Sequence, residues 1–240
     1  AALLALAQRV AGALSAPFDR GGHEHLLSAS IGGSVFPKPL ETAEDLLRET
    51  DIAMYQAKAA GRNAVAMFEP AMQHAVADRY ALERELREGL RRGELRLVLQ
   101  PQVDAASGRI CAAEALLRWR HPTRGIVPPG GFIPVAEDSG LVVPIGEWVL
   151  RESCRVLAAC TAGGRPLRIA VNVSPRQFRQ PDFVERVELI LAETGADPSL
   201  LTLEITEGLL IDDVEACTAT MGALAARGVE FSIDDFGTGF

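Results

Sequence analysis

The sequence predicts an α/β fold in which helices cover a mainly parallel sheet. From Glu94 onward, short apolar strands alternate with helical segments, which is the pattern of a parallel sheet, either closed or open. The first two strands, Leu95–Gln100 and Ile110–Trp119, are joined only by Pro101–Arg109. A parallel crossover needs about a dozen residues or more, so we expect these two strands to pair antiparallel.

Composition limits the class of protein. The chain has 240 residues, 48% of them hydrophobic, which is enough to bury the core of one or two domains. Its 24 basic and 32 acidic residues give a net charge of −8. This balance argues against a protein that coats DNA or RNA, but it does not exclude binding of a small nucleotide.

Neither the cysteines nor the apolar segments indicate export or membrane insertion. The four cysteines lack metal-site spacing and lie in apolar stretches, so we expect reduced core thiols in a cytoplasmic protein. The apolar opening, residues 1–14, is too short to cross a bilayer and is predicted to be an amphipathic helix whose beginning is missing. Because the chain also stops inside a loop at Phe240, we expect a segment truncated at both ends, with any membrane anchor of the parent protein outside it.

A helix that ends at Gly61 is the clearest element in the first third of the chain. Thr42 is predicted to be its N-cap, with Glu44 and Asp45 in the first turn, where the helix dipole favours negative charge. The other elements predicted before Glu94 are a strand over 28–36, a strand over 64–68 and a helix over 70–93. Leu82, Leu86 and Leu90 form one stripe on the last helix, which we interpret as a linker that docks by this edge.

Three motifs in this first part resemble the C-terminal third of a GGDEF (diguanylate cyclase) domain. They are Ser30-Ile31-Gly32-Gly33-Ser34, Asp51-Ile52-Ala53-Met54-Tyr55-Gln56-Ala57-Lys58 and Gly61-Arg62-Asn63. The resemblance implies mainly scaffold residues, with Lys58 near the nucleotide phosphates. We favour the simpler interpretation that Lys58 and Arg62 are solvated charges at a helix end. The glycine-rich, acid-rich loop that names the family is absent, so we expect no cyclase activity.

The later elements place one polar side chain per strand on a shared face. The predicted elements after the first hairpin are helices over 129–162, 181–194 and 212–227 and strands over 168–174, 201–207 and 229–234. Side chains alternate along a strand, so the apolar residues of each strand face the helices and the others face the centre of the sheet. Near their C-terminal ends, four strands send an oxygen ligand inward: Glu114, Asn172, Glu204 and Asp234.

Three carboxylates and an amide directed at one place require cations, because like charges buried together repel. Oxygen ligands without cysteine or histidine suit Mg²⁺ or Mn²⁺ better than Zn²⁺. Asp235 adds a bridge to a second ion, and two ions are the usual arrangement for hydrolysis of a phosphodiester. Arg118 is placed to hold a phosphate bidentately. Taken singly, each of these residues has a simpler interpretation: a carboxylate at a strand end caps a loop, and Asn172 turns the chain. Their shared face is the observation that favours a site.

The residues from about Tyr80 to the end resemble the EAL-domain cyclic-di-GMP phosphodiesterases. The matching motifs are Gln100-Pro101, Glu114-Ala115-Leu116-Leu117-Arg118-Trp119, Phe132-Ile133-Pro134-Val135-Ala136-Glu137, Val171-Asn172-Val173-Ser174, Leu203-Glu204-Ile205-Thr206-Glu207 and Asp234-Asp235-Phe236-Gly237-Thr238-Gly239. The resemblance implies a TIM-like (β/α) barrel whose first strand is antiparallel, and hydrolysis of cyclic-di-GMP to linear pGpG.

The resemblance also implies roles for individual residues. It implies a metal-ligand set, a substrate-binding set that contains Gln100, Leu116 and Arg118, and a homodimer formed through the EAL domain. Glu207 would steady the loop that begins at Asp234, and it joins Glu114, Asp234 and Asp235 as a catalytic residue. The metal-ligand set that the resemblance implies is Glu114, Asn172, Glu204, Asp234 and Asp235.

A catalytic lysine and a further glutamate of the family would lie beyond Phe240. We therefore expect an incomplete barrel at 94–240, preceded by a linker helix at 70–93 and part of a GGDEF-like domain at 1–69. Three hypotheses stay open for the function: an active metal-dependent phosphodiesterase, a receptor that binds cyclic-di-GMP without hydrolysis, and an inactive fragment. No contact with DNA, RNA or a membrane is expected within this segment.

Overall fold

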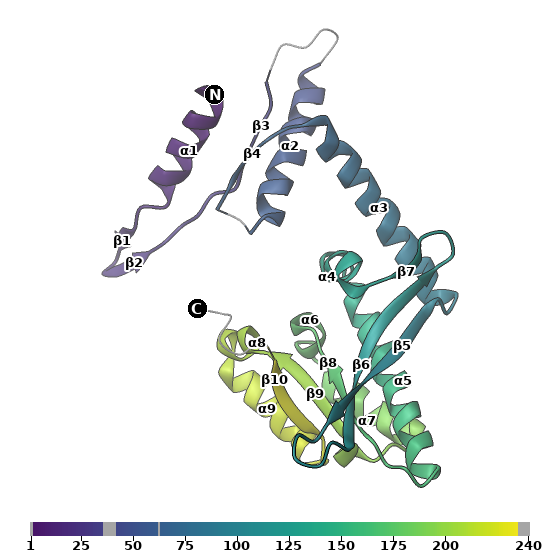
Figure 1. Ribbon diagram of the computed structural model, residues 1–240. Coiled ribbons are helices and arrows are strands. Elements are labelled where there is room, and N and C mark those ends of the chain that lie inside the picture. The colour runs from purple at the N-terminus through teal and green to yellow at the C-terminus, as the bar shows by residue number, and fades with distance from the viewer. Residues whose placement is uncertain (1, 36–41, 62, 235–240) are drawn as a thin grey trace. The chain divides into compact units, whose positions relative to one another are not determined.

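The computed structural model describes residues 2–35, 42–61 and 63–234. The chain divides into two compact units, Ala1–Ala81 and Leu82–Phe240, and the division falls within helix α3 (Pro70–Arg91). Figure 1 shows the order of the elements along the chain.

A short parallel sheet packs on helix α2 in the first unit. Strand β3 (Ile31–Gly33) pairs in parallel with β4 (Val65–Met67). Gly32 lies so close to the helix that an added Cβ would be 2.2 Å from the backbone nitrogen of Met54. Only glycine fits at this position, because the obstacle is backbone and has no room to move aside.

Helix α2 (Ala43–Ala59) begins with the predicted cap. The side chain of Thr42 accepts a hydrogen bond from the backbone N–H of Asp45, and the Asp45 carboxylate accepts one from the backbone N–H of Thr42. This reciprocal pair satisfies two N–H groups that a helix start leaves without partners. The hydrogen bonds to Thr42 lower the pKa of Asp45 below its ordinary value, with the Arg48 side chain adding to the effect.

The rest of the first unit differs from the prediction. Helix α1 (Ala2–Leu14) is present, but the strand expected over 28–36 is only the three residues of β3. A short antiparallel hairpin, β1 (Phe18–Arg20) and β2 (His23–His25), precedes it. Its strands contain mostly polar residues and carry no apolar alternation, which is why the sequence did not indicate them.

The second unit is built on one sheet with the strand order β10-β9-β8-β6-β5, with β7 added beside β6. Strands β6, β8, β9 and β10 run parallel to one another, whereas β5 pairs antiparallel with β6, as the short connection predicted. The fold class, α/β with parallel strands, is therefore confirmed. The strand bounds are β5 Leu95–Val103, β6 Ile110–His121, β7 Gly125–Val127, β8 Arg168–Asn172, β9 Leu201–Thr206 and β10 Glu230–Asp234.

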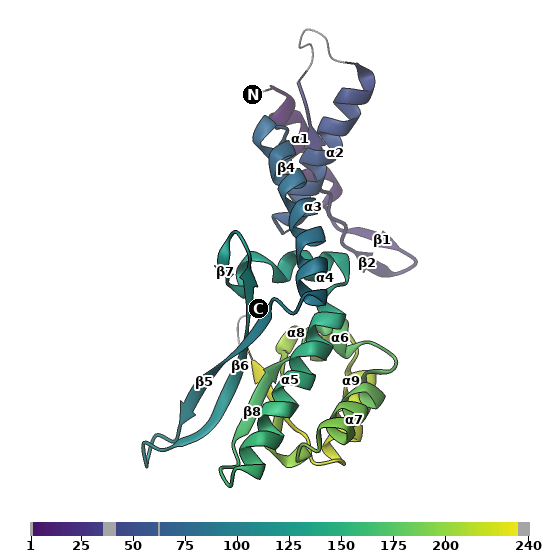
Figure 2. The ribbon, with the colours of Figure 1, turned by 90° about the vertical axis from the view of Figure 1, so that its right-hand side faces the viewer.

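Helices α5, α7 and α9 lie on the same side of β6 and β8 (Figure 2). Two of the predicted helices are shorter than expected, and the first is interrupted. Gly140, with a φ of 81°, ends α4 in the left-handed conformation and lets α5 start in a new direction. The helix bounds are η1 Pro129–Gly131, α4 Ile133–Ser139, α5 Val142–Ala162, α6 Pro175–Phe178, α7 Phe183–Thr194, η2 Pro198–Leu200, α8 Glu207–Asp212 and α9 Val214–Ala225.

The core of the second unit includes a cluster around Trp119, which has no exposed surface. Its ring packs edge-on against Phe132, with centroids 5.7 Å apart, and its Nε1 donates to Glu94 Oε2 at 3.1 Å. Leu86 of α3 is fully buried in the same core, and Leu82 and Leu90 pack against it, so the predicted leucine edge does dock here. The C-terminal half of α3 is thereby part of the second unit.

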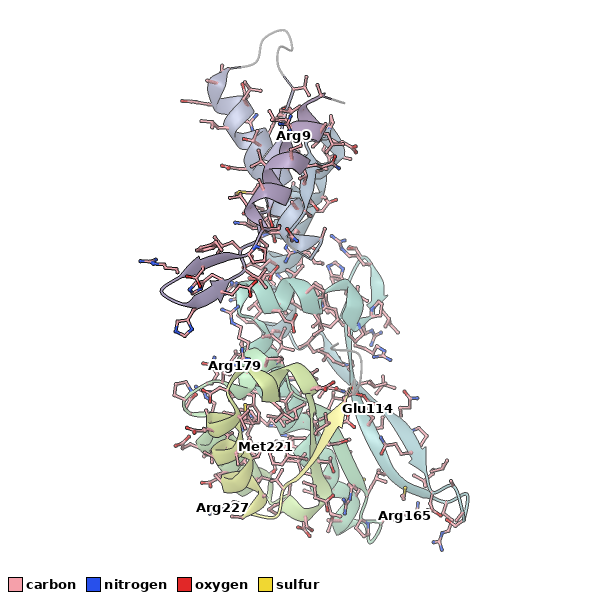
Figure 3. The ribbon with its side chains drawn as sticks, turned by 90° about the vertical axis from the view of Figure 1, so that its left-hand side faces the viewer. Arg9, Glu114, Arg165, Arg179, Met221 and Arg227 are labelled. Carbon is pink, nitrogen blue, oxygen red and sulfur yellow. The ribbon has the colours of Figure 1, made fainter. Side chains whose placement is uncertain are left out.

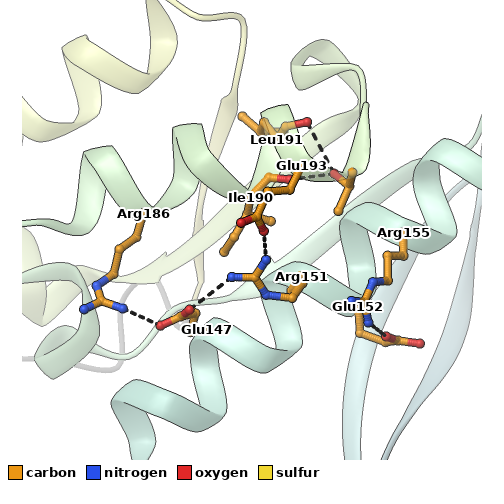
Figure 4. Close-up of polar contacts among 9 residues, drawn as sticks. Glu147, Arg151, Glu152, Arg155, Arg186, Ile190, Leu191 and Glu193 are labelled. Carbon is orange, nitrogen blue, oxygen red and sulfur yellow. Dashed lines mark hydrogen bonds and ion pairs between the residues drawn. The ribbon is translucent and has the colours of Figure 1, made fainter.

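Salt bridges connect α5 and α7 at the surface (Figure 4). Arg151 on α5 pairs with Glu193 on α7 and with Glu147 on its own helix, at 3.2 Å for the second pair. Arg186 pairs with Glu147 at 2.6 Å. Each exposed pair contributes at most about 1 kcal/mol, so this network orients the helices more than it stabilises the fold.

The structure tests what the sequence predicted for the cysteines and for membrane-spanning helices. Cys154 and Cys217 are buried and free, as expected of core thiols, and burial raises the pKa of the Cys154 thiol to about 11. Cys111 is exposed, so the expectation of a core thiol was wrong there; it lies next to the turn of the β5–β6 hairpin. Among the described residues, every helix is too short or too polar to span a membrane.

We expect Gly89→Ala to destabilise the second unit although alanine favours helices. An added Cβ at Gly89 would lie 2.7 Å from Trp119 Nε1 and 2.9 Å from Glu94 Oε2, where it disrupts their hydrogen bond. Gly222 of α9 has nothing within 4 Å of the same position, so Gly222→Ala is the matched control and should stabilise by about 0.5–1 kcal/mol. Thermal unfolding of the two variants should shift in opposite directions; equal shifts would contradict the packing described here.

Candidate functional site

One face of the sheet carries the polar side chains that the sequence singled out. In β6, Ala115, Leu117 and Trp119 are buried, whereas Glu114, Leu116 and Arg118 alternate with them and are partly exposed. The predicted alternation is therefore confirmed for this strand, and Figure 3 shows the position of Glu114. The same alternation holds in β9, where Leu203 and Ile205 are fully buried and Glu204 is not.

The strand register carries this face across the sheet. Ala115 is paired with Val171, which places Asn172 one position further along β8 on the Glu114 face. Asn172 is paired directly with Glu204 on β9. Thr206, two residues beyond Glu204, is paired with Asp234 on β10. The four oxygen-bearing side chains thus follow a diagonal across four neighbouring strands. Asn172 and Asp234 are the last residues of β8 and β10 and Glu204 lies near the end of β9, whereas Glu114 lies in the first half of β6, so the expected position near a strand end was wrong for Glu114.

These side chains interact with one another. Asn172 Nδ2 donates a hydrogen bond to Glu114 Oε1 at 2.8 Å, although the two residues are 58 positions apart in the chain. Burial raises the pKa of Glu204, and the negative charges of Glu114 and Asp234 raise it further. The carboxylates of three strands therefore lie close enough to repel, which is the electrostatic situation that a cation relieves.

The antiparallel strand β5 extends this face. Gln100 is paired directly with Glu114 and is exposed, so the amide and the carboxylate lie on the same face. The next pair on that face is Val98 with Leu116, and the one after it is Arg96 with Arg118. The structure therefore brings Gln100, Leu116 and Arg118 to one surface beside the carboxylates.

The structure says less about two other predicted site residues, Glu207 and Asp235. Glu207 is the first residue of α8 and follows Thr206, the register partner of Asp234. It therefore lies beside the end of β10, and the strand predicted to extend to Glu207 instead ends one residue earlier. Asp235 lies outside the described residues.

The donor set fits a hard divalent cation by its chemistry. Its members are carboxylate and amide oxygens, the ligands that Mg²⁺ and Mn²⁺ take in proteins, and their mutual repulsion gives a reason for a cation. Among residues 2–35, 42–61 and 63–234, however, no group of three His, Cys, Asp or Glu side chains is gathered closely enough to hold one ion. The candidate ligands in the described part of the chain lie on one face, but they are not gathered around a single point.

Comparison with known proteins shows which family the chain belongs to. The EAL domain model matches residues 83–240, and the model of the diguanylate cyclase, GGDEF domain matches residues 1–64. The chain belongs to the EAL domain family. The match covers the whole described sheet of the second unit, including every strand that carries a candidate ligand.

Two relatives show how far this similarity extends. The chain is 42% identical over 236 residues to a bifunctional diguanylate cyclase/cyclic di-GMP phosphodiesterase, MucR, of Pseudomonas aeruginosa; this covers 98% of the chain and 34% of MucR. A cyclic di-GMP phosphodiesterase of the same organism, NbdA, is 36% identical and is covered to 30% of its length. The chain thus spans about a third of the length of these curated relatives.

A solved structure agrees with the sequence match. The structure of the PaMucR phosphodiesterase in complex with c-di-GMP superimposes with a TM-score of 0.65 at 45% identity, covering 67% of this chain and 65% of that one. The EAL-domain fold of the second unit is therefore supported by the coordinates as well as by the motifs.

Sequence reasoning missed that Arg96 and Val98 belong to this face. The signal was available, because the hairpin fixes the register: Gln100 opposite Glu114 requires Val98 opposite Leu116 and Arg96 opposite Arg118. The antiparallel pairing was predicted, but its register was not worked out. The residues of β5 that share the face of Glu114 were therefore not predicted.

We expect Asn172→Asp to destabilise the protein in the absence of divalent cations. The change removes the amide donor to Glu114 and adds a fourth negative charge to the face, so it should cost about 1 kcal/mol more than Asn172→Ala, which removes the hydrogen bond alone. Thermal unfolding in EDTA measures the stability that each variant loses, and thermal unfolding with excess Mn²⁺ measures how much of that loss a cation offsets. The extra loss should shrink when Mn²⁺ is added. Identical stability of the two variants in EDTA would show that these carboxylates do not converge.

Proposed function

We propose that the second unit is part of a metal-dependent phosphodiesterase that hydrolyses cyclic-di-GMP to linear pGpG. The observation that carries the proposal is the diagonal of Glu114, Asn172, Glu204 and Asp234 on one sheet face. Support comes from relatives whose names include this activity and from the similar structure that contains c-di-GMP. The described sheet would be part of a TIM-like (β/α) barrel, with domain bounds near 70 and 94.

The metal ligands would be the four diagonal residues together with Asp235. Phosphodiesterases of this family depend on metal ions. Mg²⁺ or Mn²⁺, with two ions held side by side, fits the all-oxygen set best. When bound, such ions would lower the pKa of water and offset the charge that develops on the phosphate.

The chain's own residues would then orient the substrate. The hydrogen bond from Asn172 fixes the Glu114 carboxylate, so that its second oxygen keeps a defined direction. Arg118 would hold a phosphate with its planar guanidinium, and Gln100 and Leu116 would contact the nucleotide beside it. Glu207 would position the segment that follows β10. Each of these roles depends on the shared face rather than on any single residue.

Two further proposals concern the first unit and the oligomeric state. We propose that residues 1–69 belong to a GGDEF-like domain and that residues 70–93 link it to the phosphodiesterase domain. We further propose a homodimer formed through the EAL domain. Sedimentation of the full-length protein would test the dimer independently of its activity.

Glu114→Gln should reduce hydrolysis of cyclic-di-GMP by more than about 100-fold, because it removes a charged ligand while keeping the size of the side chain. The assay is chromatographic detection of pGpG formed by the full-length protein with Mg²⁺ or Mn²⁺. Glu152→Gln is the control; Glu152 lies on α5, paired with Arg155, and its loss should leave turnover unchanged. Full activity of Glu114→Gln would remove this residue from the site. A wild type that binds cyclic-di-GMP without producing pGpG would identify a receptor.

Arg118→Lys should raise the KM for cyclic-di-GMP by about tenfold with kcat nearly unchanged. Lysine keeps the positive charge but loses the planar fork that a phosphate accepts. Steady-state kinetics of the full-length protein separate the two constants. A fall in kcat at constant KM would instead make Arg118 a residue of the transition state.

A further inference from the structure

Arg96 and Arg118 lie directly opposite each other on neighbouring antiparallel strands. Directly opposed residues of such a pair have Cβ atoms about 5 Å apart and project from the same face. Like charges in this arrangement repel and destabilise the sheet. The arrangement therefore requires a reason, and an anion between the two guanidinium groups is the simplest one.

Neither arginine satisfies its charge within the described part of the chain. Arg96 Nη1 donates to the carbonyl oxygens of Gly93 and Leu95, each at 2.6 Å, and Arg118 Nη1 donates to that of Leu117 at 2.8 Å. Both therefore fold back onto backbone, and neither forms an ion pair with an acidic side chain of the described residues. A guanidinium has five N–H donors, so most of theirs remain for a ligand.

Some other arginines of the second unit are neutralised within the chain. Arg124, Arg151 and Arg168, for example, each pair with a glutamate. Arg96 is exposed and Arg118 is half-buried, so a solute can reach both. Arg109 and several other arginines of the second unit also have no ion pair among the described residues, but Arg96 and Arg118 differ from Arg109 in lying directly opposite another arginine across a strand pair.

The pair forms the last of three rows across β5 and β6. We name them the amide row (Gln100 and Glu114), the apolar row (Val98 and Leu116) and the cation row (Arg96 and Arg118). Val98 is 47% exposed, so the apolar row offers surface to a ligand. Rows are two residues apart, which puts the cation row about 13 Å along the strands from the amide row, a distance that long arginine side chains shorten.

This sequence of rows matches the chemistry of a cyclic dinucleotide. Such a molecule has two phosphodiester groups separated by nucleosides, whose flat bases and sugars present apolar surface. If one phosphodiester lies at the carboxylates near Glu114, the apolar row is placed for a nucleoside and the cation row for the second phosphodiester. One arginine can bind both free oxygens of a phosphodiester bidentately, and a second arginine on the same face adds another positive charge and further N–H donors to the same oxygens.

We propose that Arg96, together with Arg118, binds the phosphodiester group of the substrate that is not hydrolysed. Arg96 is then a substrate-binding residue that selects a ligand with two phosphates over one with a single phosphate. This inference rests on the proposed function for the identity of the substrate. It adds a specific contact from strand β5, which otherwise contributes Gln100.

The test compares Arg96→Gln, Arg96→Lys and the control Arg109→Gln in the full-length protein. Arg109 is an exposed arginine of the same hairpin at the opposite end of its strands, and its replacement makes the same change in charge. The dissociation constant for cyclic-di-GMP is measured by equilibrium dialysis in EDTA, and KM and kcat are measured with Mn²⁺. Thermal unfolding of each variant reports on the turn at Gly93 that Arg96 contacts.

Arg96→Gln should raise the dissociation constant and the KM roughly 10- to 100-fold, as expected for loss of a charge-assisted hydrogen bond, with kcat within about twofold. Arg96→Lys should be intermediate, and Arg109→Gln should match the wild type. The proposal is overturned if Arg96→Gln binds like Arg109→Gln, if only its unfolding temperature changes, or if kcat falls while KM is constant. A wild type that binds without hydrolysis would refute the proposed function but not this contact, because the dissociation constants still test it.

Discussion

The parallel register of β6, β8, β9 and β10 is the constraint on which the site depends. Because side chains alternate along a strand, a shift of one residue in any pairing would turn that strand's polar residue towards the helices. Glu204 would then replace a fully buried Leu203 or Ile205 in the core, at the cost of burying a carboxylate without a partner. The apolar face therefore fixes the polar face, and packing against α5, α7 and α9 decides where the carboxylates lie.

An ion pair supports the same face at the other end of the strands. Arg168, at the start of β8, pairs with Glu230, at the start of β10, across the intervening β9. Both residues share the Glu114 face, since Arg168 is paired with Ala112 and Glu230 with Thr202. One end of the face thus carries compensated charge, whereas towards the other end burial and the negative charges of Glu114 and Asp234 raise the pKa of Glu204. This contrast along a single face distinguishes a structural salt bridge from the candidate metal site.

The sequence predicted the elements that depend on local patterns and missed those that depend on register or on one backbone angle. Alternating apolar residues were enough to place Glu114, Asn172, Glu204 and Asp234 on one face. The break at Gly140 was missed because the apolar spacing continues from α4 into α5, and only the left-handed φ of the glycine separates them. The hairpin of β1 and β2 was missed because its strands are short and mostly polar, and the face of Arg96 was missed because register follows from the complete hairpin rather than from either strand.

The position of β6 also depends on the helix that precedes the sheet. Backbone bonds fix the short connection from α3 to β5: Glu94 N–H donates to the carbonyl of Gly89, and Arg120 N–H donates to the carbonyl of Glu94. His121, buried at the end of β6, accepts at Nδ1 from the backbone N–H groups of Thr123 and Arg124. Its neutral form therefore carries the proton on Nε2, which lies 3.2 Å from Glu85 Oε2 on α3. Because Trp119 and His121 are held on one face of β6 and Arg118 projects from the other, the contacts that fix this end of β6 against α3 also set the position of Arg118.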